Sequence, residues 1–155
     1  MGGMISTDAA GKGSRVYGKT SDHVLSLDAV FLGGTQWRAE ALESTELAAA
    51  QERDDIVGEV HRTIHEIVQE KAGVIKEVFP SLRRFMTGYN LAKVYDAQRE
   101  RFDLTYFLAG SEGTLGILVE AKLKITPVPS HTRLVLVKYQ RFKDALASAE
   151  SLVER

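Results

Sequence analysis

The first clear section of the hydrophobic pattern predicts a β-hairpin over residues 23–42. Apolar and polar side chains alternate along both arms, which is typical of strands with one buried face. The face expected to be buried on the first arm consists of Leu25, Leu27, Ala29 and Phe31. Gly33 and Gly34 predict the turn, because glycine readily adopts the positive φ that short hairpin turns require.

From Ser44 the period changes to three and four residues, which predicts a helix that ends near residue 72. Either Ser44 or Thr45 is expected to cap its start, and Gly73 to follow its C-terminus. A second helical piece is expected over residues 80–84.

The remaining segments carry weaker patterns. The first 22 residues are rich in Gly, Ser, Thr and Asp and predict a loop, as does "TGYN" at 87–90. Residues 91–109 are expected to be mostly helical, with Asp103 as a cap. Residues 143–155 predict an amphipathic helix.

Three glycines precede the last alternating strand, which is expected over residues 117–126. Its predicted buried face consists of Ile117, Val119, Ala121, Leu123 and Ile125. Gly110 can end a helix in a left-handed cap. Gly113 and Gly116 either expose backbone N–H groups to a ligand or allow tight packing within the protein, and residue patterns alone favour neither.

Strands and helices in this order predict an α+β fold with a mixed, largely antiparallel sheet flanked by helices. Residues 133–139, "RLVLVKY", show little alternation and predict a strand buried on both faces. This strand and the helix after it are expected to open a second domain. The predicted domains are therefore residues 1–129, with a helical insertion at about 41–80, and residues 130–155.

Composition restricts the chemistry. The chain has 155 residues, a net charge of −1 and no cysteine, which argues against nucleic acid as a partner and excludes thiol chemistry within it. No apolar stretch is long enough to span a membrane, and the lack of a signal-like N-terminus favours the cytoplasm.

His61 and His65 lie one helical turn apart, which is the spacing of a two-histidine metal site. Arg62 replaces the glutamate of the zinc-protease pattern, so we expect both histidines to be solvated boundary residues and not metal ligands.

Four segments, in the same order, resemble the FAD-binding domain of the vanillyl-alcohol oxidase / p-cresol methylhydroxylase flavoprotein family. They are "GGMISTDAAG", "VYGKTSDHVLSLDAVFLGG", "MTGYNL" and "GSEGTLGILVEAKLKITPVP". The long insertion at 41–80 is similar to that of large bacterial FAD-linked oxidases related to D-lactate and D-2-hydroxyglutarate dehydrogenases. The resemblance is to the second part of that domain and the first residues of the substrate domain.

The resemblance implies which residues lie along the cofactor. They are Thr7, Asp8, Ala9, Ala10, Glu112, Gly113, Thr114, Leu115, Gly116, Ile117 and Leu118. Backbone groups of the second run would hold polar atoms of FAD, and Ile117 would supply apolar contact. The family commonly carries Asn at the position of Asp8, and a carboxylate there would repel a nearby diphosphate.

The function implied is FAD-dependent oxidation of a D-2-hydroxy acid by hydride transfer to the flavin, in an intact enzyme that binds FAD and a small hydroxy acid. No catalytic residue is expected in this chain, and a homo-oligomer is compatible with the resemblance. The pyrophosphate loop of the family lies upstream of the matched segments, so the isolated chain is expected to bind FAD weakly or not at all. Two alternatives remain: a non-catalytic α+β module that binds no flavin alone and serves a structural or interaction role, and a helical interaction module over residues 44–72.

Overall fold

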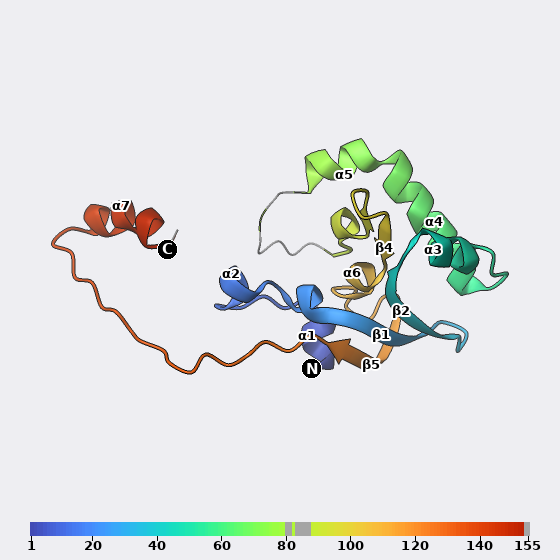
Figure 1. Ribbon diagram of the computed structural model, residues 1–155, viewed down its shortest axis with the longest axis horizontal. Coiled ribbons are helices and arrows are strands. Elements are labelled where there is room, and N and C mark those ends of the chain that lie inside the picture. Colours follow the sequence, from blue (N-terminus) through green and yellow to red (C-terminus); the bar gives the residue numbers. More distant parts are fainter. Residues whose placement is uncertain (80–81, 83–87, 154–155) are drawn as a thin grey trace. The chain divides into compact units, whose positions relative to one another are not determined.

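The computed structural model describes residues 1–79, 82 and 88–153, and it divides into one unit at 1–125 and another at 126–155. The first unit contains a five-stranded sheet in the order β3-β4-β2-β1-β5 (Figure 1). All four pairings are antiparallel, which confirms the α+β prediction. The strands are β1 (Val24–Phe31), β2 (Gln36–Leu42), β3 (Tyr95–Asp96), β4 (Arg101–Asp103) and β5 (Gly116–Leu123).

The predicted hairpin is confirmed as β1 and β2, which pair from Ser26 opposite Glu40 to Val30 opposite Gln36. The predicted buried face was wrong at one position, because Leu25 is 47% exposed. A register shift against β5 lies between Val24 and Ser26, and this irregularity turns Leu25 outward.

The alternating strand before Pro127 is confirmed as β5, and its predicted buried face was right at Ala121 and Leu123, which pack against the core. It was wrong at Ile117, Val119 and Ile125, which are exposed, whereas Leu118 packs against the core. A second register shift, between the pairs Asp28–Glu120 and Ala29–Leu118, leaves Val119 without an opposite residue. One extra residue reverses the alternation of the residues before it, so Leu118 takes the inward position that the pattern assigned to Ile117.

The predicted helix from Ser44 is present as two helices, α3 (Ser44–Gln51) and α4 (Ile56–Glu70). Glu43, and neither Ser44 nor Thr45, is the N-cap of α3, in a reciprocal capping box with Glu46. Asp55 caps α4 by accepting a hydrogen bond from the Gly58 backbone N–H. Gly73 does not end the helix, because it lies inside a third one, α5 (Ala72–Val78).

Residues 91–109 are not mostly helical, which corrects that prediction. They form a short 3₁₀ helix η2 (Leu91–Lys93), the strands β3 and β4, and one helical turn α6 (Thr105–Leu108). Pairing of β4 with β2 buries Phe102 to 1% exposure, and this tertiary contact outweighs the local helical pattern. The expected role of Asp103 is found in part, since its Oδ1 accepts hydrogen bonds from the Thr105 backbone N–H and hydroxyl at the start of α6. The helical piece expected over 80–84 lies outside the described residues apart from Leu82.

The N-terminal segment contains short helices where a loop was predicted. They are α1 (Gly2–Ser6), α2 (Ser14–Tyr17) and the 3₁₀ helix η1 (Thr20–His23). Ile5 in α1 is 2% exposed and packs with Leu27, Ala29 and Leu108. Burial of this one apolar side chain fixes α1 against the sheet, although the segment is too short to be a stable helix alone.

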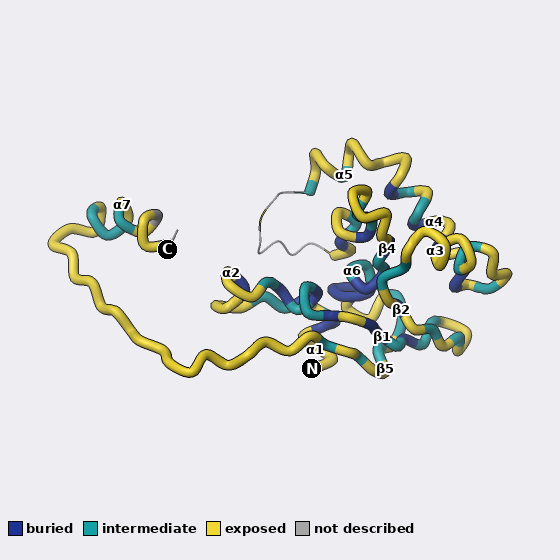
Figure 2. The backbone as a smooth tube through the Cα atoms, viewed as in Figure 1, coloured by how far each residue is buried: buried dark blue, intermediate teal, exposed yellow. Residues whose placement is uncertain are grey.

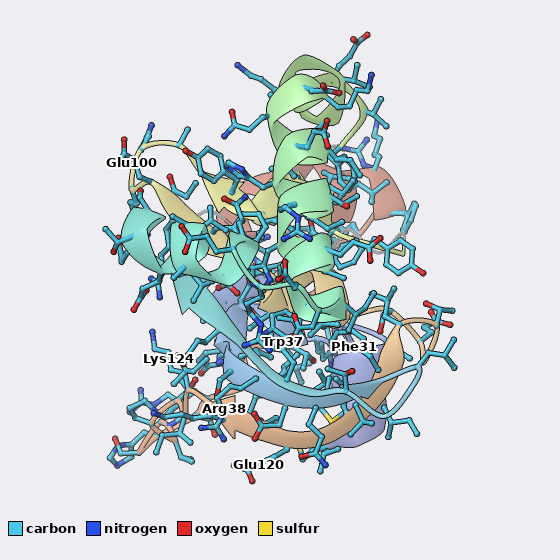
Figure 3. All side chains as sticks on the ribbon, turned by 90° about the vertical axis from the view of Figure 1, so that its right-hand side faces the viewer. Phe31, Trp37, Arg38, Glu100, Glu120 and Lys124 are labelled. Carbon is cyan, nitrogen blue, oxygen red and sulfur yellow. The ribbon has the colours of Figure 1, made fainter. Side chains whose placement is uncertain are left out.

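Two apolar clusters form the core of this unit, and Trp37 contacts both. One lies around α1, β1 and the start of β5; the other lies between α4, β4 and α6. Trp37 and Phe31 point toward α4, while Arg38 and Glu120 project from the other face of the sheet (Figure 3). Asp28, Arg38 and Glu120 form an exposed row of charges there.

In the second unit, the predicted C-terminal helix is confirmed as α7 (Phe142–Val153). The strand expected over 133–139 is absent from this unit, and residues 126–141 are exposed throughout (Figure 2). A strand needs a pairing partner, and no described residue of this unit provides one. No helix within the described ranges is long and apolar enough to cross a membrane.

Candidate functional site

The two segments predicted to lie along a cofactor are next to each other in the structure. The backbone N–H of Gly110 donates to the Ile5 carbonyl at 2.9 Å, and the N–H of Glu112 donates to the Ser6 carbonyl, also at 2.9 Å. These bonds join the end of α1 to the turn between α6 and β5. Residues about a hundred positions apart in the sequence therefore form one continuous surface.

A buried ion pair stabilises the first of these segments. The Asp8 carboxylate pairs with the Lys19 ammonium, and both side chains are less than a tenth exposed. The other carboxylate oxygen, Oδ1, accepts a hydrogen bond from the Ser21 backbone N–H at 2.9 Å. Asp8 itself has a positive φ of 44°, which is uncommon for a residue with a side chain. Its side chain is thus engaged inside the protein.

The other residues of the first segment divide between exposed and partly buried positions. Thr7 is exposed, and both its backbone N–H and its hydroxyl donate to the Gly3 carbonyl. Ala9 and Ala10 are partly buried, and the Ala9 carbonyl accepts hydrogen bonds from the backbone N–H and hydroxyl of Thr20. The Thr7 hydroxyl oxygen keeps a lone pair with which it can accept a further hydrogen bond.

The three glycines that precede β5 have different surroundings. A Cβ on Gly110 would lie 3.2 Å from the Asp8 Cβ, and a Cβ on Gly116 would lie 2.6 Å from the Val30 carbonyl oxygen. The protein's own packing therefore explains the absence of a side chain at both positions. At Gly113 nothing lies within 4 Å of the added carbon, although its φ of 82° also favours glycine. Gly113 alone of the three faces open space.

The turn around Gly113 offers both polar and apolar groups to solvent. Glu112, Gly113 and Thr114 are exposed, and the Gly113 backbone N–H has no hydrogen-bond partner among the described residues. Ile117, three residues after Thr114, is exposed, while Leu115 and Leu118 pack against the core beneath. A free backbone donor beside an exposed aliphatic side chain suits a ligand with polar and flat apolar parts.

Two cavities among the described residues lie away from this turn. One of about 940 Å³ is bordered by α2, α5 and η2, and another of about 290 Å³ lies beside His61 and Trp37. Neither is lined by any residue predicted to contact the cofactor. A ligand at the Gly113 turn would therefore lie outside these two cavities.

Of the two histidines that stood out in the sequence, His61 is buried in the core and His65 is partly buried at its edge. His61 is 1% exposed, so the expectation that it is a solvated boundary residue was wrong. Its Nδ1 donates to the Val57 carbonyl at 2.7 Å, and its ring packs between Trp37 and Phe102. Burial lowers the pKa of His61 from 6.5, and the nearby Arg53 acts in the same direction. Within the described ranges, no group of three or more His, Asp or Glu side chains could hold a metal ion.

Comparison with curated proteins first finds similarity to FAD-linked oxidoreductases. An uncharacterized FAD-linked oxidoreductase of Mycobacterium tuberculosis is 30% identical over 79 residues, which are 51% of this chain and 16% of that protein. Over nearly its whole length the chain matches proteins named D-2-hydroxyglutarate dehydrogenase. That of Pseudomonas putida is 46% identical over 153 residues and that of Escherichia coli 44% identical over 154, each covering 99% of this chain and 15% of the relative.

These matches confirm the resemblance to FAD-linked oxidases related to D-2-hydroxyglutarate dehydrogenases. The chain spans about 15% of the length of the relatives that it matches end to end. No family model matches it, and no solved structure gives a significant match.

Sequence reasoning missed three residues that shape this surface. Lys19 and Ser21 engage the Asp8 side chain, and the Tyr89 hydroxyl lies 2.7 Å from the Thr114 hydroxyl. The contact between Lys19 and Asp8 could not be predicted, because eleven residues separate them and no sequence periodicity links the two positions. Tyr89 lies in "TGYN", which predicted only a turn.

Proposed function

We propose that this chain is part of an FAD-dependent dehydrogenase that oxidises a D-2-hydroxy acid, with D-2-hydroxyglutarate as the first candidate substrate. The observation that carries this proposal is the 44–46% identity to proteins of that name over 99% of the chain. The two hydrogen bonds that join the predicted cofactor segments support it independently.

Residues Thr7–Ala10 and Glu112–Leu118 would form one wall of the FAD site. When bound, FAD supplies the hydride acceptor for oxidation of the substrate carbon. In this assignment the Gly113 N–H donates to a polar atom of the cofactor, and the exposed Ile117 side chain packs against an apolar part. The proposed contact at Asp8 is through its backbone, because its carboxylate is already paired with Lys19.

The ion pair also removes an electrostatic objection to this assignment. An unpaired carboxylate at Asp8 would repel a diphosphate. Lys19 balances that charge, so the segment is neutral where a cofactor anion would approach. The chain's own contribution is to bind and orient the cofactor, and we assign no proton transfer to any of its residues.

The same surface supports weak binding by the 155-residue chain alone. The proposed contact residues line neither of the two cavities, and open surfaces seldom bury enough of a ligand for tight binding. We propose that residues from elsewhere in a longer polypeptide cover the cofactor's second side. A cytoplasmic location and a homo-oligomeric state stay predictions.

Purification of the full-length protein that contains this segment tests the function. We expect a flavin absorption spectrum that bleaches without oxygen when D-2-hydroxyglutarate is added. The L enantiomer is the matched control and should leave the spectrum unchanged. A protein that carries no flavin after reconstitution with FAD, or one reduced equally by both enantiomers, would contradict the proposal.

A further inference from the structure

Tyr89 contacts the turn at Gly113 through one hydrogen bond. Its hydroxyl oxygen lies 2.7 Å from the Thr114 Oγ1, and the two residues are 25 positions apart in the sequence. Thr114 in turn bonds to Ser111, whose carbonyl lies 2.6 Å from the Thr114 hydroxyl and 3.0 Å from its backbone nitrogen. A chain of hydrogen bonds therefore runs from Tyr89 into the backbone of the turn.

The direction of these bonds follows from the atoms available. The Ser111 carbonyl can only accept, so the single hydroxyl hydrogen of Thr114 is directed to it. The Thr114 oxygen is then an acceptor, and Tyr89 is the donor. Removal of the Tyr89 hydroxyl therefore leaves the Thr114 oxygen without its donor while the Thr114–Ser111 bond stays in place.

An aromatic contact holds Tyr89 in position for this bond. Its ring packs on Phe107 of α6, with ring centroids 4.9 Å apart. Phe107 also packs against the buried cluster that contains Phe102 and Leu104. The hydroxyl is thus presented to the turn by a ring that is fixed to the core, and a phenylalanine at position 89 would keep the ring contact.

We infer that Tyr89 is a positioning residue that holds the Ser111–Thr114 turn in the conformation that binds FAD. The inference rests on the proposed function, because it assigns the turn a cofactor to bind. Tyr89 is 40% exposed, so water competes for its hydroxyl in the free chain. A cofactor that covers the turn excludes this water, and the same bond then contributes more to binding than to stability.

The test uses two preparations and four variants. FAD affinity is measured by fluorescence titration of the reconstituted full-length protein, and backbone order parameters of residues 111–114 are measured by NMR in the 155-residue chain. The variants are Tyr89→Phe, Thr114→Val, their combination and Thr114→Ser. Tyr106→Phe is the matched control, since it removes a hydroxyl from α6 that, among the described residues, makes no hydrogen bond to the turn.

Loss of one hydrogen bond should weaken FAD binding about fivefold to tenfold in Tyr89→Phe. The double variant should bind no more weakly than Thr114→Val alone, because the hydroxyls act as one unit. Thr114→Ser keeps the hydroxyl and should retain near-original affinity, as should Tyr106→Phe. Order parameters in Tyr89→Phe should fall from rigid values of about 0.85 toward the flexible range near 0.6.

The outcomes separate the two claims. Unchanged FAD affinity and unchanged order parameters in Tyr89→Phe overturn the inference and leave the proposed function standing. Lowered order parameters with unchanged FAD affinity also overturn the inference, because Tyr89 would then order the turn without any effect on FAD binding. A full-length protein that never binds FAD overturns the proposed function, and the inference with it.

Discussion

Two regions of the first unit use buried polar groups in opposite ways. Around α1 and the Gly113 turn, a charged pair, Asp8 and Lys19, is buried and joins loop to loop. Around α4, the buried polar side chain is His61, whose pKa is lowered by burial and whose ring lies between Trp37 and Phe102. The first region fixes backbone conformation through specific polar bonds, and the second is stabilised by apolar packing.

The difference supports our proposal that the cofactor binds at the first of these regions. Burial of charges is costly, and packed apolar residues of similar volume often give equal or greater stability. Polar bonds at Asp8 and Gly110 instead specify one backbone arrangement on an exposed surface. This is the arrangement that a binding surface needs, whereas the α4 region needs only to stay packed.

The largest effect is expected from separating the buried charges. Lys19→Met should lower the free energy of unfolding by about 3–5 kcal/mol, because it leaves the buried Asp8 carboxylate without the Lys19 ammonium. The double variant Asp8→Asn/Lys19→Met should lose less than Lys19→Met alone. Urea unfolding followed by circular dichroism measures this. Arg38→Met, which breaks the exposed pair with Asp28, is the control and should change little. Equal effects from Lys19→Met and Arg38→Met would contradict the comparison.

In the α4 region, truncation of a packed apolar side chain should be the most costly change. Ile64→Ala should lower the free energy of unfolding by about 2–5 kcal/mol, since Ile64 is buried against β4 and α6. Ile56→Ala in the same helix is the control, and its loss should be much smaller because Ile56 is 38% exposed. Similar unfolding midpoints for the two variants would show that α4 is not packed as described.

The glycines before β5 allow a finer test. Gly116→Ala should lower the free energy of unfolding by about 2 kcal/mol, because the added Cβ would meet the Val30 carbonyl oxygen and force a backbone shift. Gly113→Ala should cost about 1 kcal/mol for its left-handed backbone alone. Thermal unfolding gives this order, and a greater loss at Gly113 would mean that its surroundings are not open.

The smallest expected effect is a pH dependence from His61. Its pKa is lowered in the folded state, so its contribution to stability is complete above pH 6.5 and is lost as the pH falls through the folded-state pKa. Between about pH 8 and about pH 5, the original chain should therefore lose more stability than His61→Gln. Parallel pH profiles of unfolding would contradict this assignment.

Sequence reasoning was most successful where local pattern and tertiary structure agree. The β1–β2 hairpin, the α3–α4 region and α7 follow from periodicity and turn residues alone. The predicted inward face of β5 was wrong at Ile117 and Val119, because a one-residue bulge at Val119 reverses the alternation before it and leaves no signal in the composition. The helical prediction for residues 91–109 was wrong because the pairing of β4 with β2 decides the structure of this segment.

The candidate surface was predictable only in part. The resemblance identified its two segments, but the role of the glycines could not be decided from sequence. Contacts between distant residues explain two of them: Asp8 lies against Gly110, and Val30 lies against Gly116. Lys19 and Tyr89 lie in segments that carry the resemblance, but the sequence assigns neither a role, since their importance depends on what lies opposite them in space.

The most direct test of the central claim is an NMR titration of the isotope-labelled 155-residue chain with FAD. We expect weak, fast-exchange binding, with chemical-shift changes confined to residues 5–10 and 110–118. Shift changes centred on the cavity between α2 and α5 would contradict the assignment of this surface to the cofactor.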